Sequence, residues 1–371
     1  MNANISLGKI WGIPLGLNAS WFVIFLLSTF SLSTGYFPIQ YPELGLAGSV
    51  LLGLITTLLL FGSVLAHELG HAYLALRNNI PVKGITLFIF GGVAQISSEP
   101  KTPGAEFRIA IAGPLVSVAL AALFGGLYLI EASVPYLAAP AFYLMRINLI
   151  LTLFNLIPGF PLDGGRVLRA IIWKLSSSYV HATKYASIGG QIVAFGFIGL
   201  GIFQVFTGQV INGLWLGLIG WFLQNAAGSA YAQMNIQQSL RGVTVSQAMQ
   251  QDSVQVPALT PVSYLVEGYV LNNGRTNFLV EEDGQVRGIL TLQEIMTVPQ
   301  TRWRYTTAGQ IMVPLARTVQ VDSESELLMA LEKMENANLS HVSVIEHENL
   351  VGILSRDQMS RYLRLRSELG V

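Results

Sequence analysis

Long apolar runs dominate the chain up to about Ala232, and an ordinary mixture of polar and apolar residues follows. A helix needs about 20 predominantly apolar residues to cross a bilayer, and six runs reach that length. The expected spans are Ala19–Phe37, Leu46–Leu76, Phe107–Ile130, Tyr136–Ile157, Tyr185–Phe206 and Ile211–Tyr231. The pattern therefore predicts a polytopic α-helical membrane part followed by a polar C-terminal part.

Two further stretches predict strands rather than spans. The segment ISLGKIWGIPLGL alternates apolar and small residues, which predicts a strand pair lying against the membrane surface. Pro81–Pro100 is apolar but short and broken by glycine, and ITLFIF and VAQIS predict two strands around Gly91 and Gly92. Non-helical backbone is tolerated at membrane depth only where it is buried or lines a cavity. We therefore expect a small β-strand element beside the helices.

Basic residues fall on alternate connections between the expected spans. They are Lys9, then Arg77, Lys83, Lys101 and Arg108, then Arg166, Arg169, Lys174 and Lys184. The opposite connections, Pro38–Gly45, Glu131–Pro135 and Thr207–Val210, contain none. Lysine and arginine gather on the cytoplasmic side of membrane proteins, so both termini of this cell-membrane protein are predicted to be cytoplasmic.

Composition narrows the possible chemistry. The 371 residues are 52% hydrophobic and 11% charged, against about 25% charged residues in soluble domains. The formal net charge is zero, so no basic field suggests nucleic acid as a partner. The absence of cysteine excludes disulfides and thiolate ligands, so any metal site must use His, Asp or Glu.

One polar motif, His67-Glu68-Leu69-Gly70-His71, lies at the end of the second apolar run. Residues i and i+4 share a helix face, so both histidines can bind one metal ion. Glu68 is placed to handle the proton of a metal-bound water, and zinc suits imidazole and carboxylate ligands. A chance coincidence is the alternative. Because three polar groups are costly in a membrane-length apolar segment unless they are used, we favour the metal site.

The segment NLIPGFPLDGGR offers a third ligand. Two prolines and two glycines break the chain after the fourth expected span, at the depth inferred for the histidines, where Asp163 can turn back toward them. Asn155, near the end of that span, could donate a hydrogen bond to a substrate carbonyl. Taken alone, the pattern P-x-D-G-G is commonly a turn whose Asp163 caps a helix over Val167–Leu175, but the presence of the histidine motif favours the metal ligand.

FGSVLAHELGHA, the glycine pair of FIFGGVAQ, AGPLVS and NLIPGFPLDGGR together resemble the site-2 protease family of intramembrane zinc metalloproteases. The resemblance covers the whole membrane part. It implies a zinc ion held by His67, His71 and Asp163, with Glu68 as general base. It also implies that Asn155 lies beside the scissile peptide, and that the substrate is a single-span membrane protein such as an anti-sigma factor or a membrane-tethered regulator.

The polar part contains an internal repeat. VTVSQAMQQDSVQV and FLVEEDGQVRGILTLQEI recur as TAGQIMVPLARTV and VSVIEHENLVGILSRDQM. Each copy predicts strand, helix, strand, strand, helix, and the pair resembles tandem CBS domains. The fold class is thus six transmembrane helices with a small β-strand element, followed by an α+β CBS pair. The expected boundaries are 1–235 for the membrane domain, 239–298 for the first CBS domain and 305–366 for the second.

The CBS resemblance implies a site for an adenosyl nucleotide, ATP or AMP. In that family a strand-end motif, G-I-L-[ST]-x-x-D, binds the ribose, and we match Gly352–Asp357 to it, with Ser355 and Asp357 as ligands. The first copy offers Thr291 but has Glu294 where the aspartate should be. The alternative is a module without ligand that serves stability or formation of a homodimer.

Two functions from different classes follow. One is an intramembrane zinc metalloprotease in the lipid bilayer that is regulated through its CBS pair. The other is a catalytically silent membrane sensor of an ion or a nucleotide, or a transporter. Glu68 favours the protease, because a pure binding site gains little from a non-ligand carboxylate between two histidines. A transporter should also show paired repeats with broken helices, and the membrane part shows no such repeat.

Overall fold

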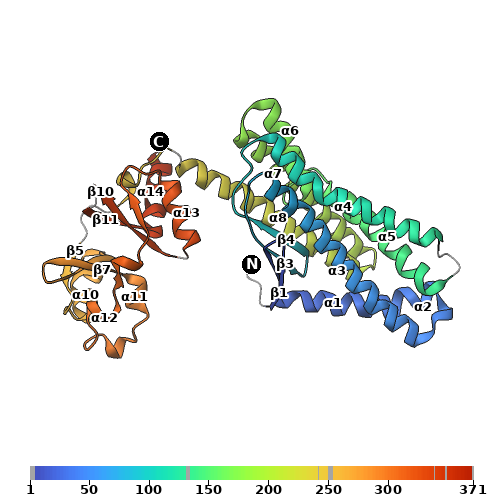
Figure 1. Cartoon of the computed structure of the whole chain (residues 1–371), viewed down its shortest axis with the longest axis horizontal. Coiled ribbons are helices and arrows are strands. Elements are labelled where there is room, and N and C mark those ends of the chain that lie inside the picture. Colours follow the sequence, from blue (N-terminus) through green and yellow to red (C-terminus); the bar gives the residue numbers. More distant parts are fainter. Residues whose placement is uncertain are drawn as a thin grey trace. The chain divides into compact units, whose positions relative to one another are not determined.

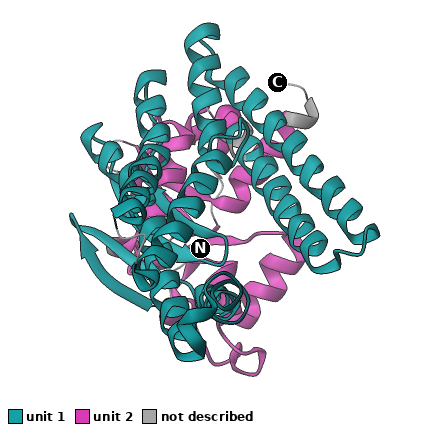
Figure 2. Cartoon of the chain, turned by 90° about the vertical axis from the view of Figure 1, so that its right-hand side faces the viewer, with its two compact units in different colours: residues 1–234 teal, residues 235–371 magenta. Residues whose placement is uncertain are grey.

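The computed structural model describes residues 5–130, 134–240, 242–249, 254–337, 339–346 and 349–369. They form two compact units, Met1–Met234 and Asn235–Val371 (Figure 2). The first unit corresponds to the apolar part of the sequence and the second to the polar part.

The first unit consists mainly of helices. They are α1 (Ala19–Ser31), α2 (Phe37–Gln40), α3 (Gly45–Arg77), α4 (Pro103–Ile130), α5 (Pro135–Asn155), α6 (Asp163–Ser176), α7 (Tyr179–Phe206) and α8 (Val210–Leu240). The last residues of α8, from Asn235 on, belong to the second unit. A π-helical turn at Leu32–Tyr36 joins α1 to α2, and a 3₁₀ turn at Pro42–Leu44 leads into α3. The long helices α3, α4 and α5 pack side by side, and α6 packs against α4 and α7 (Figure 1).

Five stretches of the described residues are long and apolar enough to cross a membrane. They are Ala19–Gln40, Pro42–Arg77, Pro103–Ile130, Pro135–Asn155 and Tyr179–Phe206. They confirm the multi-pass helical fold and match the first five expected spans. The sixth expected span, Ile211–Tyr231, lies within α8, which is not among the five, so a count of six stays a prediction. Large apolar side chains such as Phe30, Leu153 and Phe195 are exposed, as lipid-facing positions require.

The strands of the first unit form one sheet in the order β1-β2-β3-β4. They are β1 (Ile5–Ile10), β2 (Ile13–Leu17), β3 (Val82–Phe88) and β4 (Gly91–Ile96). Both expected strand pairs are present as antiparallel hairpins, and a parallel β2–β3 pairing joins them. Ile13, Leu15 and Ile85 of the sheet bury their side chains with Ala72 of α3. This packing holds the sheet against the part of α3 that carries the histidine motif.

The second unit contains two sheets, in the orders β5-β6-β7-β8 and β11-β10-β9. The strands are β5 (Val254–Pro257), β6 (Asn277–Glu282), β7 (Gln285–Thr291), β8 (Val313–Pro314), β9 (Gln320–Asp322), β10 (His341–Glu346) and β11 (Asn349–Ser355). The helices are α9 (Val245–Ala248), α10 (Val262–Leu265), α11 (Leu292–Met296), α12 (Ala308–Ile311), α13 (Leu327–Asn336) and α14 (Arg356–Leu369). In each repeat a strand pairs in parallel with the first arm of an antiparallel hairpin, and a helix follows the hairpin.

The two repeats exchange their leading segments. Leu240 and Val245, at the start of the first repeat, are buried in the core of the second repeat beside Leu327. Ala308, which leads the second repeat, is buried in the core of the first beside Val262. Neither repeat therefore completes its core from its own residues, and the pair forms one packed module.

Candidate metal centre and the cavity around it

Three potential ligand atoms converge at one point of the first unit. Nε2 of His67 and Nε2 of His71 are 3.2 Å apart, and Oδ2 of Asp163 lies 3.1 Å from each of them. Both imidazoles are buried, and the Asp163 side chain is only 12% exposed. Among the described residues this is the one group of three or more His, Asp or Glu side chains close enough to hold a metal ion.

Contacts on the far side of each ring orient the two imidazoles. Nδ1 of His71 lies 2.7 Å from the Ile109 carbonyl oxygen, which can only accept, so Nδ1 carries the proton and Nε2 keeps its lone pair. Nδ1 of His67 lies 2.9 Å from Oγ of Ser117. Because α4 supplies both partners, this helix fixes the rings with Nε2 directed at the common point.

The donor set and the space around it fit zinc. Ligands of tetrahedral zinc, with bonds of about 2.0–2.1 Å, lie about 3.3 Å from one another, close to the separations seen here. Gly113 of α4 keeps that space open, since a Cβ there would lie 2.2 Å from Nε2 of His71 and 2.5 Å from Nε2 of His67. The Asp163 carboxyl supplies the oxygen ligand of this set.

Asp163 is brought to the histidines by a close turn. α5 ends at Asn155, and α6 begins at Asp163 itself rather than at Val167 as expected. A Cβ on Gly164 would lie 2.3 Å from the Leu156 carbonyl oxygen, and one on Gly165 would lie 2.3 Å from the carbonyl carbon of Gly159. Only glycine fits at these two positions, because the first turn of α6 packs directly on the preceding loop.

Glu68 lies beside the ligand group without belonging to it. Its Oε2 accepts a hydrogen bond of 3.1 Å from the backbone N–H of Ala94 in β4. Gly92 of the same strand approaches closely, since a Cβ there would lie 2.6 Å from Cγ of Glu68. The strand thus fixes the position of this carboxylate.

A cavity of about 440 Å³ opens at this point. His67, His71, Glu68, Asp163 and Asn155, the five residues singled out from the sequence, all line it. The cavity walls also include the β3–β4 turn and part of α8. The structure therefore brings together every residue predicted for the metal site.

Sequence reasoning missed part of this lining. Arg166 lines the cavity, and its position three residues after Asp163, on the same side of a helix, was the available signal. From α8 the residues are Trp215, Ile219, Phe222 and Leu223. The ring of Phe222 stacks on Phe90 of the β3–β4 turn, with centroids 4.4 Å apart. Nothing in the local pattern of α8 distinguishes these apolar residues from lipid-facing ones.

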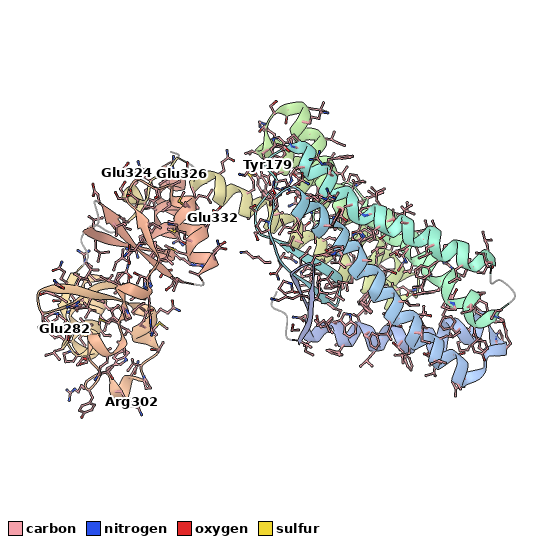
Figure 3. The ribbon with its side chains drawn as sticks, viewed as in Figure 1. Tyr179, Glu282, Arg302, Glu324, Glu326 and Glu332 are labelled. Atoms are coloured by element: carbon pink, nitrogen blue, oxygen red, sulfur yellow. The ribbon has the colours of Figure 1, made fainter. Side chains whose placement is uncertain are left out.

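Charged side chains form a cluster around Arg169, a buried residue of α6. Arg169 donates from Nε to Oε1 of Glu106 over 2.8 Å and from Nη1 to the Tyr179 hydroxyl over 2.6 Å. Its Nη2 also contacts Glu106, and it pairs with Glu99 over 3.1 Å. Tyr179 begins α7 at the end of the unit where α6 lies (Figure 3). Glu106, on α4, is completely buried, so the cluster ties α6 to α4 and α7.

A second, smaller cleft of about 180 Å³ lies between the two repeats of the second unit. Equivalent positions of the repeats face it. They are Thr276 and Ser340, Asn277 and His341, Thr291 and Ser355, Leu292 and Arg356, and Gln293 and Asp357. The three residues predicted for the nucleotide site, Thr291, Ser355 and Asp357, therefore line one cleft.

The helix caps in this cleft correct the matching of the two copies. Glu294 accepts hydrogen bonds from the backbone N–H and the hydroxyl of Thr291, at the start of α11. Gln358 makes the equivalent contact with the backbone N–H of Ser355 over 2.7 Å, at the start of α14. Gln358, and not Asp357, therefore occupies the position of Glu294, and Asp357 comes one residue too early for the motif. Both motif positions are occupied by helix-capping side chains.

His341 lies at the base of the same cleft. Burial lowers the pKa of its imidazole below the usual value, and the opposing effect of Glu294 is smaller. The ring is therefore neutral at pH 7, with Nδ1 3.2 Å from the hydroxyl of Ser340.

Comparisons with known proteins find matches for both parts of the chain. The model of peptidase family M50 matches residues 55–139 and 128–198, and the CBS domain model matches residues 308–365. A protein of Synechocystis sp. named as a zinc metalloprotease is 36% identical over 98% of this chain and 96% of its own length. Rip3 of Mycobacterium tuberculosis, also named as a zinc metalloprotease, is 36% identical over 98% of this chain and 93% of its own.

Among solved structures, the site-2 protease from Methanocaldococcus jannaschii is 32% identical to this chain. The match covers 61% of this chain and 94% of that one, with a TM-score of 0.43.

Proposed function

The chain belongs to peptidase family M50, the site-2 zinc metalloproteases, and we propose that it hydrolyses a peptide bond within a transmembrane segment of a membrane-anchored regulatory protein. The observation that carries this proposal is the position of Glu68, in the cavity beside three converging ligand atoms and held by Ala94. A site that only bound an ion would not need this carboxylate.

We propose His67, His71 and Asp163 as the zinc ligands and Glu68 as the general base. Bound zinc supplies a Lewis acid and lowers the pKa of a coordinated water. The carboxylate of Glu68 accepts the proton of the attacking water and passes it to the leaving nitrogen. The side chain of Asn155, on the wall of the same cavity, donates a hydrogen bond to the scissile carbonyl.

The position of the hairpin of β3 and β4 favours the proposal that the substrate is a peptide. β4 is the edge strand of its sheet and lines the cavity between Gly91 and Ala94. A transmembrane substrate helix must unwind before a carbonyl becomes accessible, and an edge strand can pair with the extended segment that results. We propose that β4 holds the substrate in this way, and proline replacements in β3 or β4 that leave cleavage intact would argue against it.

The substrate we propose is a single-span protein of the anti-sigma factor or membrane-tethered regulator class. The site of action that we propose is the cell membrane, with both termini of the enzyme in the cytoplasm.

The CBS pair is proposed as a regulatory module that binds an adenosyl nucleotide or forms a homodimer.

The test is cleavage of a model single-span substrate in detergent by the wild-type chain and by Glu68→Gln, each with and without ATP. We expect the variant to lose cleavage while it keeps its zinc. Equal cleavage by both proteins would exclude the mechanism and leave the sensor hypothesis. A rate that changes with ATP would support the regulatory role of the CBS pair, and an unchanged rate would support an assembly role.

A further inference from the structure

We infer that Arg166 is a further catalytic residue, which donates hydrogen bonds to the anionic oxygen formed from the scissile carbonyl, and that Glu106 is its positioning residue. This inference rests on the proposed hydrolysis of a membrane-embedded peptide. It goes beyond the zinc ligands, Glu68 and Asn155 by adding a cation to the wall of the cavity.

The first observation is the location of Arg166. It lies on α6 three residues after Asp163, a spacing that places two side chains on the same side of a helix. It lines the cavity together with Glu68 and Asn155. Its side chain is 19% exposed, so the charge lies largely away from bulk water. Electrostatic interactions are stronger in such a low-dielectric environment than in water.

The second observation is that Glu106 contacts Arg169 closely and Arg166 only at a longer distance. Its Oε1 receives the short hydrogen bonds from Arg169, whereas Nε of Arg166 stays 3.8 Å away. Among the hydrogen bonds of the described residues, none engages the terminal Nη groups of Arg166. Glu106 therefore holds Arg166 by charge from one side, and the rest of its guanidinium fork can donate into the cavity.

The third point is what an anion in this cavity would be. A transmembrane segment seldom contains acidic side chains, because a charge in the bilayer is costly. The anionic oxygen available to Arg166 is then the one that the reaction itself creates. A donor that meets charge only as it develops stabilises the transition state more than the bound substrate.

The chemistry balances without any further reactant. The water oxygen bonds to the carbonyl carbon, the π electron pair moves onto the carbonyl oxygen, and the water proton moves to Glu68. The C–N bond then breaks, the oxygen returns its electron pair to re-form the carbonyl, and the proton moves from Glu68 to the leaving nitrogen. One water is consumed, and Arg166 donates hydrogen bonds throughout without transferring a proton.

The experiment uses the full-length, zinc-loaded chain in detergent and compares wild type with Arg166→Met and Arg166→Lys. Lys174→Gln is the matched control, because Lys174 is an exposed basic residue on the same helix. Three quantities are measured: kcat and KM for the single-span substrate, the affinity for a peptide phosphonamidate that mimics the tetrahedral anion, and the zinc content.

For Arg166→Met we expect kcat to fall about 100-fold, as for loss of one oxyanion donor, with KM within about twofold. The phosphonamidate affinity should fall by a similar factor, and the zinc content should not change. Arg166→Lys keeps the charge but loses the fork, so it should recover part of the affinity even if the methionine variant folds poorly. Glu106→Asp should weaken phosphonamidate binding more than substrate binding, because it withdraws the carboxylate from Arg166.

The inference fails if Arg166→Met binds the phosphonamidate as tightly as wild type does, or if only KM changes. A loss of zinc in the same variant would instead assign Arg166 a structural role. The proposed function fails separately, if the wild-type chain does not cleave the substrate, and the phosphonamidate affinities then still decide the role of Arg166.

Discussion

At the scale of single residues, the metal centre depends as much on a missing side chain as on the ligands. Gly113 comes from the AGPLVS motif, and its position opposite both Nε2 atoms explains why glycine stands there. The ligand pair His67 and His71 could be predicted, because an i, i+4 spacing is a property of one helix. The contact between Gly113 and the histidines could not, because it depends on how α4 packs on α3.

Gly113→Ala is expected to weaken zinc binding about 10- to 100-fold, because the new methyl group would enter the space between the histidine nitrogens. Zinc content after dialysis against a graded series of chelator concentrations measures this. Gly126→Ala on the same helix is the control, since a Cβ there meets no atom within 4 Å. Equal zinc retention by both variants would contradict the proposed position of the metal.

The lowered pKa of His341 predicts that the stability of the second unit depends on pH. Its pKa is lower in the folded chain than the ordinary value of 6.5, so the unfolded state binds the proton more readily. Its contribution to stability is complete above pH 6.5 and is lost as the pH falls from there toward the folded pKa. Thermal unfolding of the second unit between pH 7.5 and 5 should show this decline. His341→Gln should flatten it, and an unchanged slope would exclude His341 as its source.

At the scale of elements, hydropathy predicts the positions of the helices well, but it does not predict which strands pair with one another. The second span was expected at Leu46–Leu76, and α3 runs from Gly45 to Arg77. The pattern of β1 and β2 predicts a strand pair against the membrane surface, but it does not indicate that β2 pairs in parallel with β3. Apolar periodicity reports which face of an element is buried, but not which partner buries it. For the same reason the α8 side of the cavity could not be foreseen.

The contact between α6 and α4 carries a prediction about stability. Glu106→Met leaves the buried guanidinium of Arg169 without its main counter-charge, and removing one partner of a buried pair costs about 3–5 kcal/mol. Glu106→Met combined with Arg169→Met should be closer to wild type than either single variant. Thermal unfolding of the four proteins in detergent, analysed as a double-mutant cycle, measures the coupling. Additive effects would show that the pair does not anchor α6.

At the scale of the whole molecule, the internal repeat was visible in the sequence, but the exchange of leading segments was not. A repeat identified by similarity suggests two self-contained domains, here 239–298 and 305–366. In the structure Val243 accepts a hydrogen bond of 2.8 Å from the N–H of Leu327, and Thr260 accepts one of 2.8 Å from the N–H of Ala308. The leading segment of each repeat therefore completes the core of the other repeat. Because of this exchange, we expect the two repeats to unfold as one unit.

Leu240 tests this arrangement, because it lies at the start of the first repeat and is 0% exposed in the core of the second. Leu240→Ala should lower the stability of the second unit by about 2–5 kcal/mol, as for other buried leucines. Amide hydrogen exchange should then accelerate in β10 and β11 as well as in β6 and β7. The control is Leu259→Ala, at a position that is 82% exposed. Acceleration confined to β10 and β11 would mean that the two repeats unfold separately, and acceleration confined to β6 and β7 would contradict the exchange of leading segments.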